Sequence, residues 1–207
     1  MKQNTILIAI VALLIGGICG YLIADKDDCG TREMDHSMMM SDERSEDGND
    51  MFRGDMMGMD HGAMMVSSER EFVAGMIPHH QEAVDTATEV LERGGSTPEI
   101  RTLAEDIIAA QETEIAMLKE WHLAWYGEVY VADNSYQPMM RDLSELSGTE
   151  LDKRFLEDMI PHHMGAIMMA QSVRPYIKHQ EVADMADAIM ETQTAEIELM
   201  REMLQTL

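Results

Sequence analysis

The sequence predicts an all-α protein whose folded part is a four-helix bundle of two duplicated helical hairpins. Three observations lead to this prediction. From about residue 67 onward, apolar residues recur with the period of an amphipathic helix. Helix start and stop signals divide this region into four segments. The five-residue block Met-Ile-Pro-His-His occurs at residues 76–80 and again at 159–163, which indicates that one half repeats the other.

The first hairpin has clear helix boundaries. Ser68 and Glu71 have the spacing of a capping box, which predicts the start of the first helix. Glycines 94–95 end it, because glycine is favoured just after a helix. Pro98 suits the first position of the second helix, which is predicted to run to about Tyr126.

The second hairpin follows a long connection over residues 127–146. Ser147 and Glu150 form another capping-box pattern, which predicts the start of the third helix. Pro175 is expected to end this helix, and the fourth helix is predicted from about Lys178 to the C-terminus.

The second helix of each hairpin also carries a repeated pattern. Residues 111–115 read Gln-x-x-Glu-Ile, and residues 193–197 read the same. This pattern repeats at an offset of 82 residues, and the His-His block repeats at 83. Because one hairpin alone would leave its apolar stripe exposed, the two halves are expected to pack on each other.

The N-terminal residues 1–24 are predicted to form a membrane anchor. Residues 6–24 are almost entirely apolar and approach the length of a bilayer span. Lys2 precedes this stretch and acidic residues follow it, which favours an N-terminus in the cytoplasm and a chain facing the periplasm or the extracellular side. A cleaved signal peptide, giving a secreted protein, is the alternative.

Residues 25–66, the Met-rich segment, are predicted to be a disordered linker. They are rich in Asp, Gly, Ser and Met and show neither a helical nor a strand period. Ten of the 23 methionines lie between residues 34 and 65. The three-residue word Met-Asp-His occurs twice here, at residues 34–36 and 59–61.

Composition excludes several classes of function. The formal net charge of -24 argues against a nucleic-acid partner, because phosphate backbones are bound by basic surfaces. Only Cys19 and Cys29 are present, so neither a disulfide framework nor a thiolate metal cage can form. No nucleophile elbow, phosphate-binding loop or dinucleotide motif occurs, and we expect no enzymatic activity.

The repeated blocks supply candidate metal ligands in the bundle. Imidazole and thioether groups suit copper, and residues three or four apart share one helix face. The candidates are Met76, His79, His80, Met159, His162 and His163, with Glu114 and Glu196 close to the same apolar stripe. The alternative for His80 and His163 is a buried hydrogen-bond network with these glutamates or with Gln111 and Gln193. His79 and His162 are expected nearer the solvent edge and are the favoured ligands.

A proline precedes each histidine pair inside a helical pattern. Pro78 and Pro161 are expected either to kink the helix or to start a new one.

The Met-rich segment supplies a second set of candidate ligands. Thioether sulfur is soft, needs no deprotonation and persists where thiols oxidise, so it favours Cu(I). Histidine with a neighbouring aspartate could take Cu(II). The candidates are Met34, His36, Met38, Met59, His61 and Met64.

The two Met-Ile-Pro-His-His blocks, with the later Gln-x-x-Glu-Ile patterns, resemble the DUF305 family over about residues 67–207. This resemblance implies a ferritin-like four-helix bundle outside the cytoplasm that binds copper. The Met-Asp-His-Ser-x-Met word at residues 34–39 is similar to the metal-binding repeats of periplasmic copper-resistance proteins.

We therefore expect a membrane-anchored, outward-facing copper-binding protein that acts in copper resistance or trafficking. Such a protein would pass its ion to a metal-accepting partner. The alternative is a scaffold or interaction module whose bundle histidines are structural. The sequence leaves open silver or zinc in place of copper, the oxidation state and the oligomeric state.

Overall fold

The computed structural model describes residues 64–132 and 135–207, and these residues are all-α. Four long helices account for most of them: α3 (Glu69–Arg93), α4 (Pro98–Tyr126), α5 (Gly148–Val173) and α6 (Gln180–Thr206). A short 3-10 helix, η2 (Arg174–Tyr176), follows α5. No strand occurs in the described ranges, so the predicted all-helical class with four helices is confirmed.

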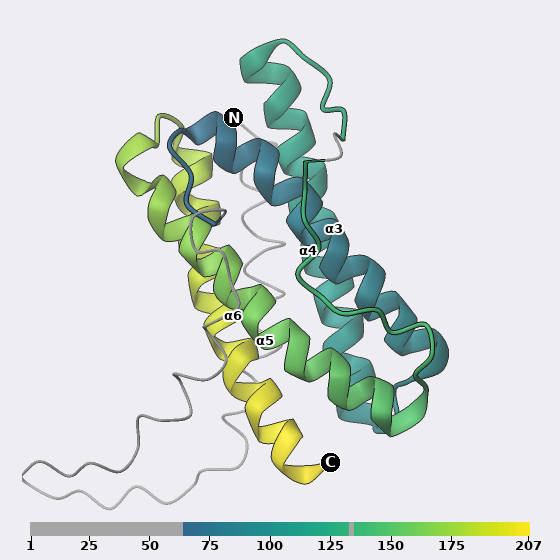
Figure 1. Cartoon of the computed structure of the whole chain (residues 1–207). Coiled ribbons are helices and arrows are strands. Elements are labelled where there is room, and N and C mark those ends of the chain that lie inside the picture. The colour runs from purple at the N-terminus through teal and green to yellow at the C-terminus, as the bar shows by residue number, and fades with distance from the viewer. Residues whose placement is uncertain (1–63, 133–134) are drawn as a thin grey trace, which may run out of the picture. The chain divides into compact units, whose positions relative to one another are not determined.

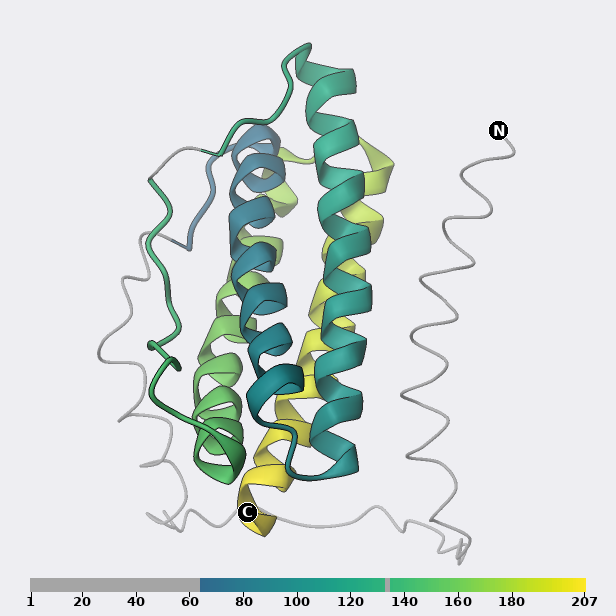
Figure 2. The same cartoon turned by 90° about the vertical axis from the view of Figure 1, so that its right-hand side faces the viewer.

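The helices pack in the order that the hairpins suggest. Helix α3 packs against α4, α5 packs against α6, and α3 also contacts α5. The connection between the hairpins, residues 127–147, runs back along the side of the bundle that α3 and α5 form (Figures 1 and 2). It is drawn in green at the left of Figure 2. This path brings the connection close to both His-His blocks.

The first hairpin begins and ends where the sequence predicts. The Ser68 hydroxyl accepts a hydrogen bond from the Glu71 backbone N–H, at 3.1 Å, and caps α3. The Glu71 carboxylate, however, accepts from the backbone and hydroxyl of Ser67, so the reciprocal half of the capping box is shifted by one residue. Gly94 ends α3, and Pro98 is the first residue of α4.

The second hairpin differs at two boundaries. Ser147 precedes α5 but makes no capping hydrogen bond, so the predicted capping box is absent there. Gly148 has a left-handed φ of 57°, which separates Ser147 from the first regular helical turn. Helix α6 begins at Gln180 instead of Lys178, because the Glu69 carboxylate binds the backbone N–H groups of Lys178 and His179.

Both prolines lie inside continuous helices. Helix α3 passes through Pro78 and α5 passes through Pro161, so a helix that restarts at each proline is ruled out.

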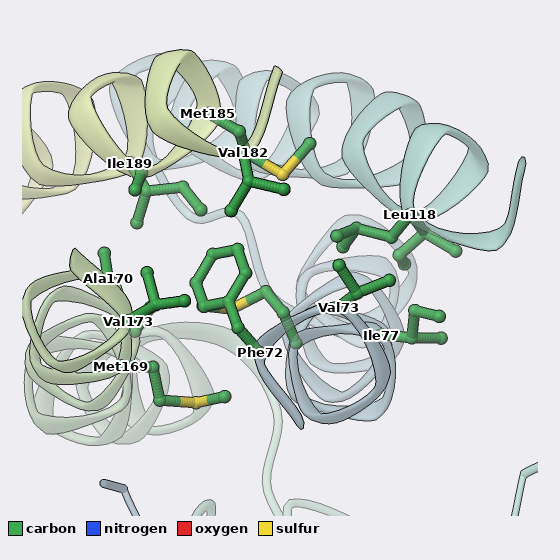
Figure 3. Packing of buried hydrophobic residues seen from close by; sticks show 14 of the residues in the cluster. Phe72, Val73, Ile77, Leu118, Met169, Ala170, Val173, Val182, Met185 and Ile189 are labelled. Atoms are coloured by element: carbon green, nitrogen blue, oxygen red, sulfur yellow. The ribbon is translucent and has the colours of Figure 1, made fainter. Parts of the chain in front are cut away.

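The core consists of two hydrophobic clusters separated by the histidines. One cluster surrounds Phe72, near the start of α3, and includes Val173 from the end of α5. Figure 3 shows Phe72 pointing between the helices toward side chains of α5 and α6. The second cluster surrounds Phe155 and includes Val90. Along α5 the His-His pair falls between these clusters, and along α3 the pair lies where the Phe72 cluster gives way to the Phe155 cluster, with Val84 still in the former.

Each hairpin loop is held by an acid from the other hairpin. Glu69, at the start of α3, accepts hydrogen bonds from the loop before α6. Asp152, at the start of α5, accepts from the N–H groups of Gly95 and Ser96, at 2.6 and 2.7 Å, in the loop before α4. Glu69 and Asp152 are 83 residues apart, the offset of the His-His blocks. The repeat in the sequence therefore corresponds to equivalent contacts in the fold.

No helix within residues 64–132 and 135–207 is long and apolar enough to cross a membrane. The predicted anchor, residues 1–24, lies outside the described residues, and so does the Met-rich segment up to residue 63. The last residues of the Met-rich segment, which were predicted to be part of the linker, lie against the bundle. Met64 and Val66 pack on the Phe72 cluster, and the Val66 N–H donates to the Ser172 hydroxyl at 3.0 Å.

Candidate metal centre

The two His-His blocks meet in the interior of the bundle. We call His79, His80, His162 and His163 the histidine cluster; none of them is more than 1% exposed. The rings of His79 and His162 are closest, with centroids 3.9 Å apart. His80 lies 6.0 Å from His79, and His163 lies 6.3 Å from His162. The contact between α3 and α5 thus gathers two histidine pairs that are 83 residues apart in the sequence.

His80 and His163 each face a glutamate on the second helix of their own hairpin. His80 Nε2 lies 2.8 Å from Glu114 Oε2, although the contact departs from hydrogen-bond geometry. His163 Nε2 is hydrogen-bonded to Glu196 Oε2 at 2.6 Å. Each of these histidines therefore lies beside the predicted glutamate, but only His163 forms a hydrogen bond with it.

The glutamines of the repeated pattern do not take this role. Gln111 and Gln193 are buried, and their side-chain oxygens have no hydrogen-bond partner.

His79 and His162 are not near the solvent edge, so that prediction was wrong. The connection between the hairpins covers them. The Tyr136 ring lies 6.4 Å from the His79 ring, edge to face. A projection of isolated helices could not reveal this cover, because it arises from a segment without helical periodicity.

Glu82 fixes the connection in place and was missed by the sequence analysis. Its carboxylate accepts hydrogen bonds from the Tyr136 hydroxyl and from the N–H groups of Met139 and Met140, at 2.8 and 2.9 Å. It also lies 3.4 Å from His162 Nε2. Glu82 follows His79 by three residues and so shares its helix face, which is the signal that could have revealed it.

Burial holds the imidazoles of His79 and His162 in their neutral form. Desolvation lowers the pKa of His79 well below the ordinary histidine value, and the neighbouring histidines lower it further. Desolvation also lowers the pKa of His162, although the nearby Glu82 opposes this. For Glu82, burial would raise the pKa, but hydrogen bonds from His162, Tyr136 and Met140 outweigh it and lower the pKa. Neutral imidazole is the form that binds metal ions.

The histidine cluster contains buried ring nitrogens without partners. They are both nitrogens of His79 and of His80 and the Nδ1 atoms of His162 and His163, although His80 Nε2 lies 2.8 Å from Glu114 Oε2. A buried polar atom without a partner costs about 1–3 kcal/mol, so several in one place call for an explanation. Unpaired, neutral nitrogens are the donor set that copper, silver or zinc would use.

These donors do not form a closed cage. No group of three His, Cys, Asp or Glu side chains in the described residues is arranged to hold a metal ion. Methionine is the remaining type of donor. Met76 and Met159 are fully buried one turn before the histidines, in the Phe72 and Phe155 clusters respectively.

The predicted ligands of the Met-rich segment divide into two groups. Met34, His36, Met38, Met59 and His61 lie outside the described residues. Met64 lies within them, partly buried against α5.

Comparison with known proteins agrees with this architecture. The sequence model described as "Domain of unknown function (DUF305)" matches residues 24–122 and 69–204. The chain belongs to the DUF305 family. The chain has no match among curated proteins.

Three solved structures illustrate the similarity to this DUF305 chain. "CopM in the Cu(II)-bound form" is 32% identical, with a TM-score of 0.61 over 69% of this chain and 99% of that one. "CopM in the Cu(I)-bound form" is 33% identical, with a TM-score of 0.61 over 67% and 96%. A putative secreted DUF305 protein from Streptomyces coelicolor is 28% identical, with a TM-score of 0.59 over 65% and 89%.

Proposed function

We propose that this DUF305 protein binds copper outside the cytoplasm, with copper as its cargo, and acts in copper resistance or trafficking without being an enzyme. The observation that carries this proposal is the histidine cluster, with its buried and unpaired ring nitrogens. The similarity to CopM, which has been crystallised with Cu(I), Cu(II) and Ag, supports copper as the ion.

Cu(I) is the favoured oxidation state because of the available donors. Imidazole suits copper, and thioether sulfur selects the soft monovalent ion. The Met-rich segment would capture Cu(I), and the histidine cluster would hold it. His36 and His61, each beside an aspartate, would offer a separate site for Cu(II).

The proposal includes an arrangement of the whole chain. Residues 1–24 would anchor the protein in a membrane, residues 25–66 would act as a capture segment, and residues 67–207 would form a bundle of two duplicated hairpins. Several copper sites of low affinity in the Met-rich segment would favour passing the ion to a metal-accepting protein over holding it.

An anaerobic Cu(I) titration of the full chain against a chromophoric competitor tests the capture role. We expect a variant without the methionines and histidines of residues 34–65 to lose most of its Cu(I) capacity. An unchanged stoichiometry would refute this role of the Met-rich segment.

A second candidate function, a scaffold with structural histidines, is favoured by one observation. His163 Nε2 is hydrogen-bonded to Glu196 and His80 Nε2 lies 2.8 Å from Glu114, so one nitrogen of each ring already has a carboxylate beside it. This candidate predicts that replacing His79 and His162 together by alanine leaves copper affinity unchanged. A decrease in affinity in a variant that keeps its helical circular dichroism spectrum would exclude it.

A further inference from the structure

The exposed apolar side chains of the bundle are concentrated at one end. Within the described ranges, the large apolar side chains that are more than a third exposed are Met65, Leu123, Val129, Val131, Tyr176 and Leu207. Four of them belong to the last turn of α4, the residues directly after it, and η2. This end of the bundle, which also contains the starts of α3 and α6, is at the top of Figure 2. Leu207 lies at the opposite end.

An aromatic cluster occupies the same end of the bundle. The rings of Trp121 and Trp125, the two tryptophans of the chain, stack with centroids 5.2 Å apart. Trp125 also stacks on His179, at the start of α6, at 3.7 Å, and meets Tyr126 edge to face. Both tryptophans are only partly buried. Tryptophan and tyrosine combine an apolar ring with one polar group, and they are therefore enriched where lipid meets water.

The N-terminal part of the chain joins the bundle close to this end. The described chain begins at Met64, whose sulfur lies close to Gly165, eight residues or about 12 Å before the end of α5. It then passes Val66, whose N–H binds the Ser172 hydroxyl, and reaches the start of α3. The predicted anchor within residues 1–24 is thus connected to this end through residues 25–63. If that linker is a random coil, its r.m.s. end-to-end distance is about 35 Å, which keeps the bundle close to the membrane.

Charge narrows the choice of partner for this end. The formal net charge of -24 opposes an anionic surface and also opposes a second copy of the chain. Two basic residues at this end are already paired with acids, Arg70 with Glu128 and Arg174 with Asp187. Little positive charge is therefore left to attract anionic lipid headgroups. The exposed side chains instead match the apolar part of a lipid–water interface.

We propose that this end of the bundle docks on the lipid–water interface of the membrane that holds the predicted anchor, through Leu123, Val129 and Val131 and the aromatic cluster beside them. This inference rests on the anchor in the proposed function and is independent of the ion that the protein binds. The tether keeps this end at a high local concentration near the lipid, so a patch too small to bind from solution can still dock. Docking would leave the loop between α3 and α4, at the opposite end, facing away from the membrane.

Tryptophan fluorescence of the full chain, reconstituted in phosphatidylcholine vesicles, tests the docking. Since both tryptophans of the chain lie at this end, the emission reports on this end alone. Bromine atoms on lipid chains quench tryptophan only at short range, so we expect weaker emission in brominated than in ordinary phosphatidylcholine. Because the contact is apolar, the quenching should persist in high salt. Flotation of the vesicles shows separately whether the chain is bound to the membrane.

A double variant and a matched control identify the docking surface. Replacing Val129 and Val131 together by serine should lower the ratio of docked to undocked protein about tenfold or more, because two apolar side chains no longer leave water. Leu207→Ser removes an exposed apolar side chain at the opposite end and should leave the quenching unchanged. The two valines are 71% and 79% exposed, so the double variant should keep its helical circular dichroism spectrum and still float with the vesicles.

The outcomes separate docking from the proposed function. If the chain floats but bromine does not quench its emission, or if the double valine variant is quenched as strongly as the unaltered chain, docking is wrong and the anchor stands. Emission that changes with protein concentration but is not quenched by bromine would identify a second copy as the partner and also overturn docking. If the chain does not float, the anchor and the docking both fail, while copper binding is decided by its own titration.

Discussion

At the scale of single residues, the histidine cluster combines two kinds of histidine. His163 and His80 form short contacts with glutamates, whereas His79 has no hydrogen-bond partner for either nitrogen. The paired histidines thus have a structural reason to be buried. The unpaired nitrogens have no hydrogen-bond partner within the described chain, and a bound metal ion would give them one.

The two histidine–glutamate pairs differ in solvent exposure, and this predicts different stabilities of variants. The Glu196 side chain is 6% exposed and that of Glu114 is 14% exposed. Breaking a buried pair leaves an uncompensated charge, so His163→Ala should lower the free energy of unfolding by about 3 kcal/mol. His80→Ala should cost less, because water partly reaches Glu114. Urea unfolding of the metal-free protein measures both values, and an equal or reversed order would contradict this account.

The depressed pKa values of His79 and His162 predict a pH-dependent stability. Below the ordinary histidine pKa of 6.5, the unfolded chain binds protons that the folded chain excludes. The free energy of unfolding should therefore be highest above pH 6.5 and fall as the pH decreases toward about 5. The lowered pKa values of Glu69 and Glu82 act at lower pH.

Urea unfolding of the metal-free protein across this range tests the prediction. A variant with glutamine at positions 79 and 162 provides the control, and its stability should depend less on pH between these limits. If the free energy of unfolding depends on pH in the same way in both proteins, these two histidines bind protons in the folded state as readily as in the unfolded state.

At the scale of secondary-structure elements, the connection between the hairpins is part of the site. Two acids hold it: Glu82 on α3 binds its middle, and Asp158 on α5 binds the backbone and guanidinium of Arg141. The connection covers His79 and carries Met139. It therefore does more than join α4 to α5.

Removing the Glu82 carboxylate should release this connection without unfolding the helices. In Glu82→Ala, the N–H groups of Met139 and Met140 lose their acceptor, so their hydrogen exchange should accelerate about tenfold or more. Exchange in α4 and α6 should stay unchanged. Hydrogen–deuterium exchange of Glu82→Ala, with the exposed Glu112→Ala as the control, measures this. Unaltered exchange at Met139 would show that Glu82 does not hold the connection.

At the scale of the whole molecule, periodic features were predictable from the sequence. Capping residues and glycines located the ends of the first hairpin, and the repeat at residues 76–80 and 159–163 predicted that equivalent residues would be found in both halves. His163 and Glu196 were each predicted on or beside the apolar stripe of their own helix, so their pairing could be anticipated.

Features that depend on the irregular connection were not predictable. The burial of His79, the role of Glu82 and the position of Met139 all depend on how residues 127–147 fold back on α3 and α5. This segment has no helical period, so the sequence does not predict which of its side chains face the bundle. Met64 was predicted to be a metal ligand in the linker. The position of its sulfur close to Gly165 could be learned only from the structure.

The central claim, that the bundle itself binds copper, is tested most directly by an anaerobic Cu(I) titration of the compact unit formed by residues 60–207. This fragment lacks most methionines of the Met-rich segment. We predict that it competes with a chromophoric Cu(I) chelator, and that replacing His79 and His162 removes this competition. If the full chain binds Cu(I) but the fragment does not, the Met-rich segment is the binding part and the bundle histidines are structural.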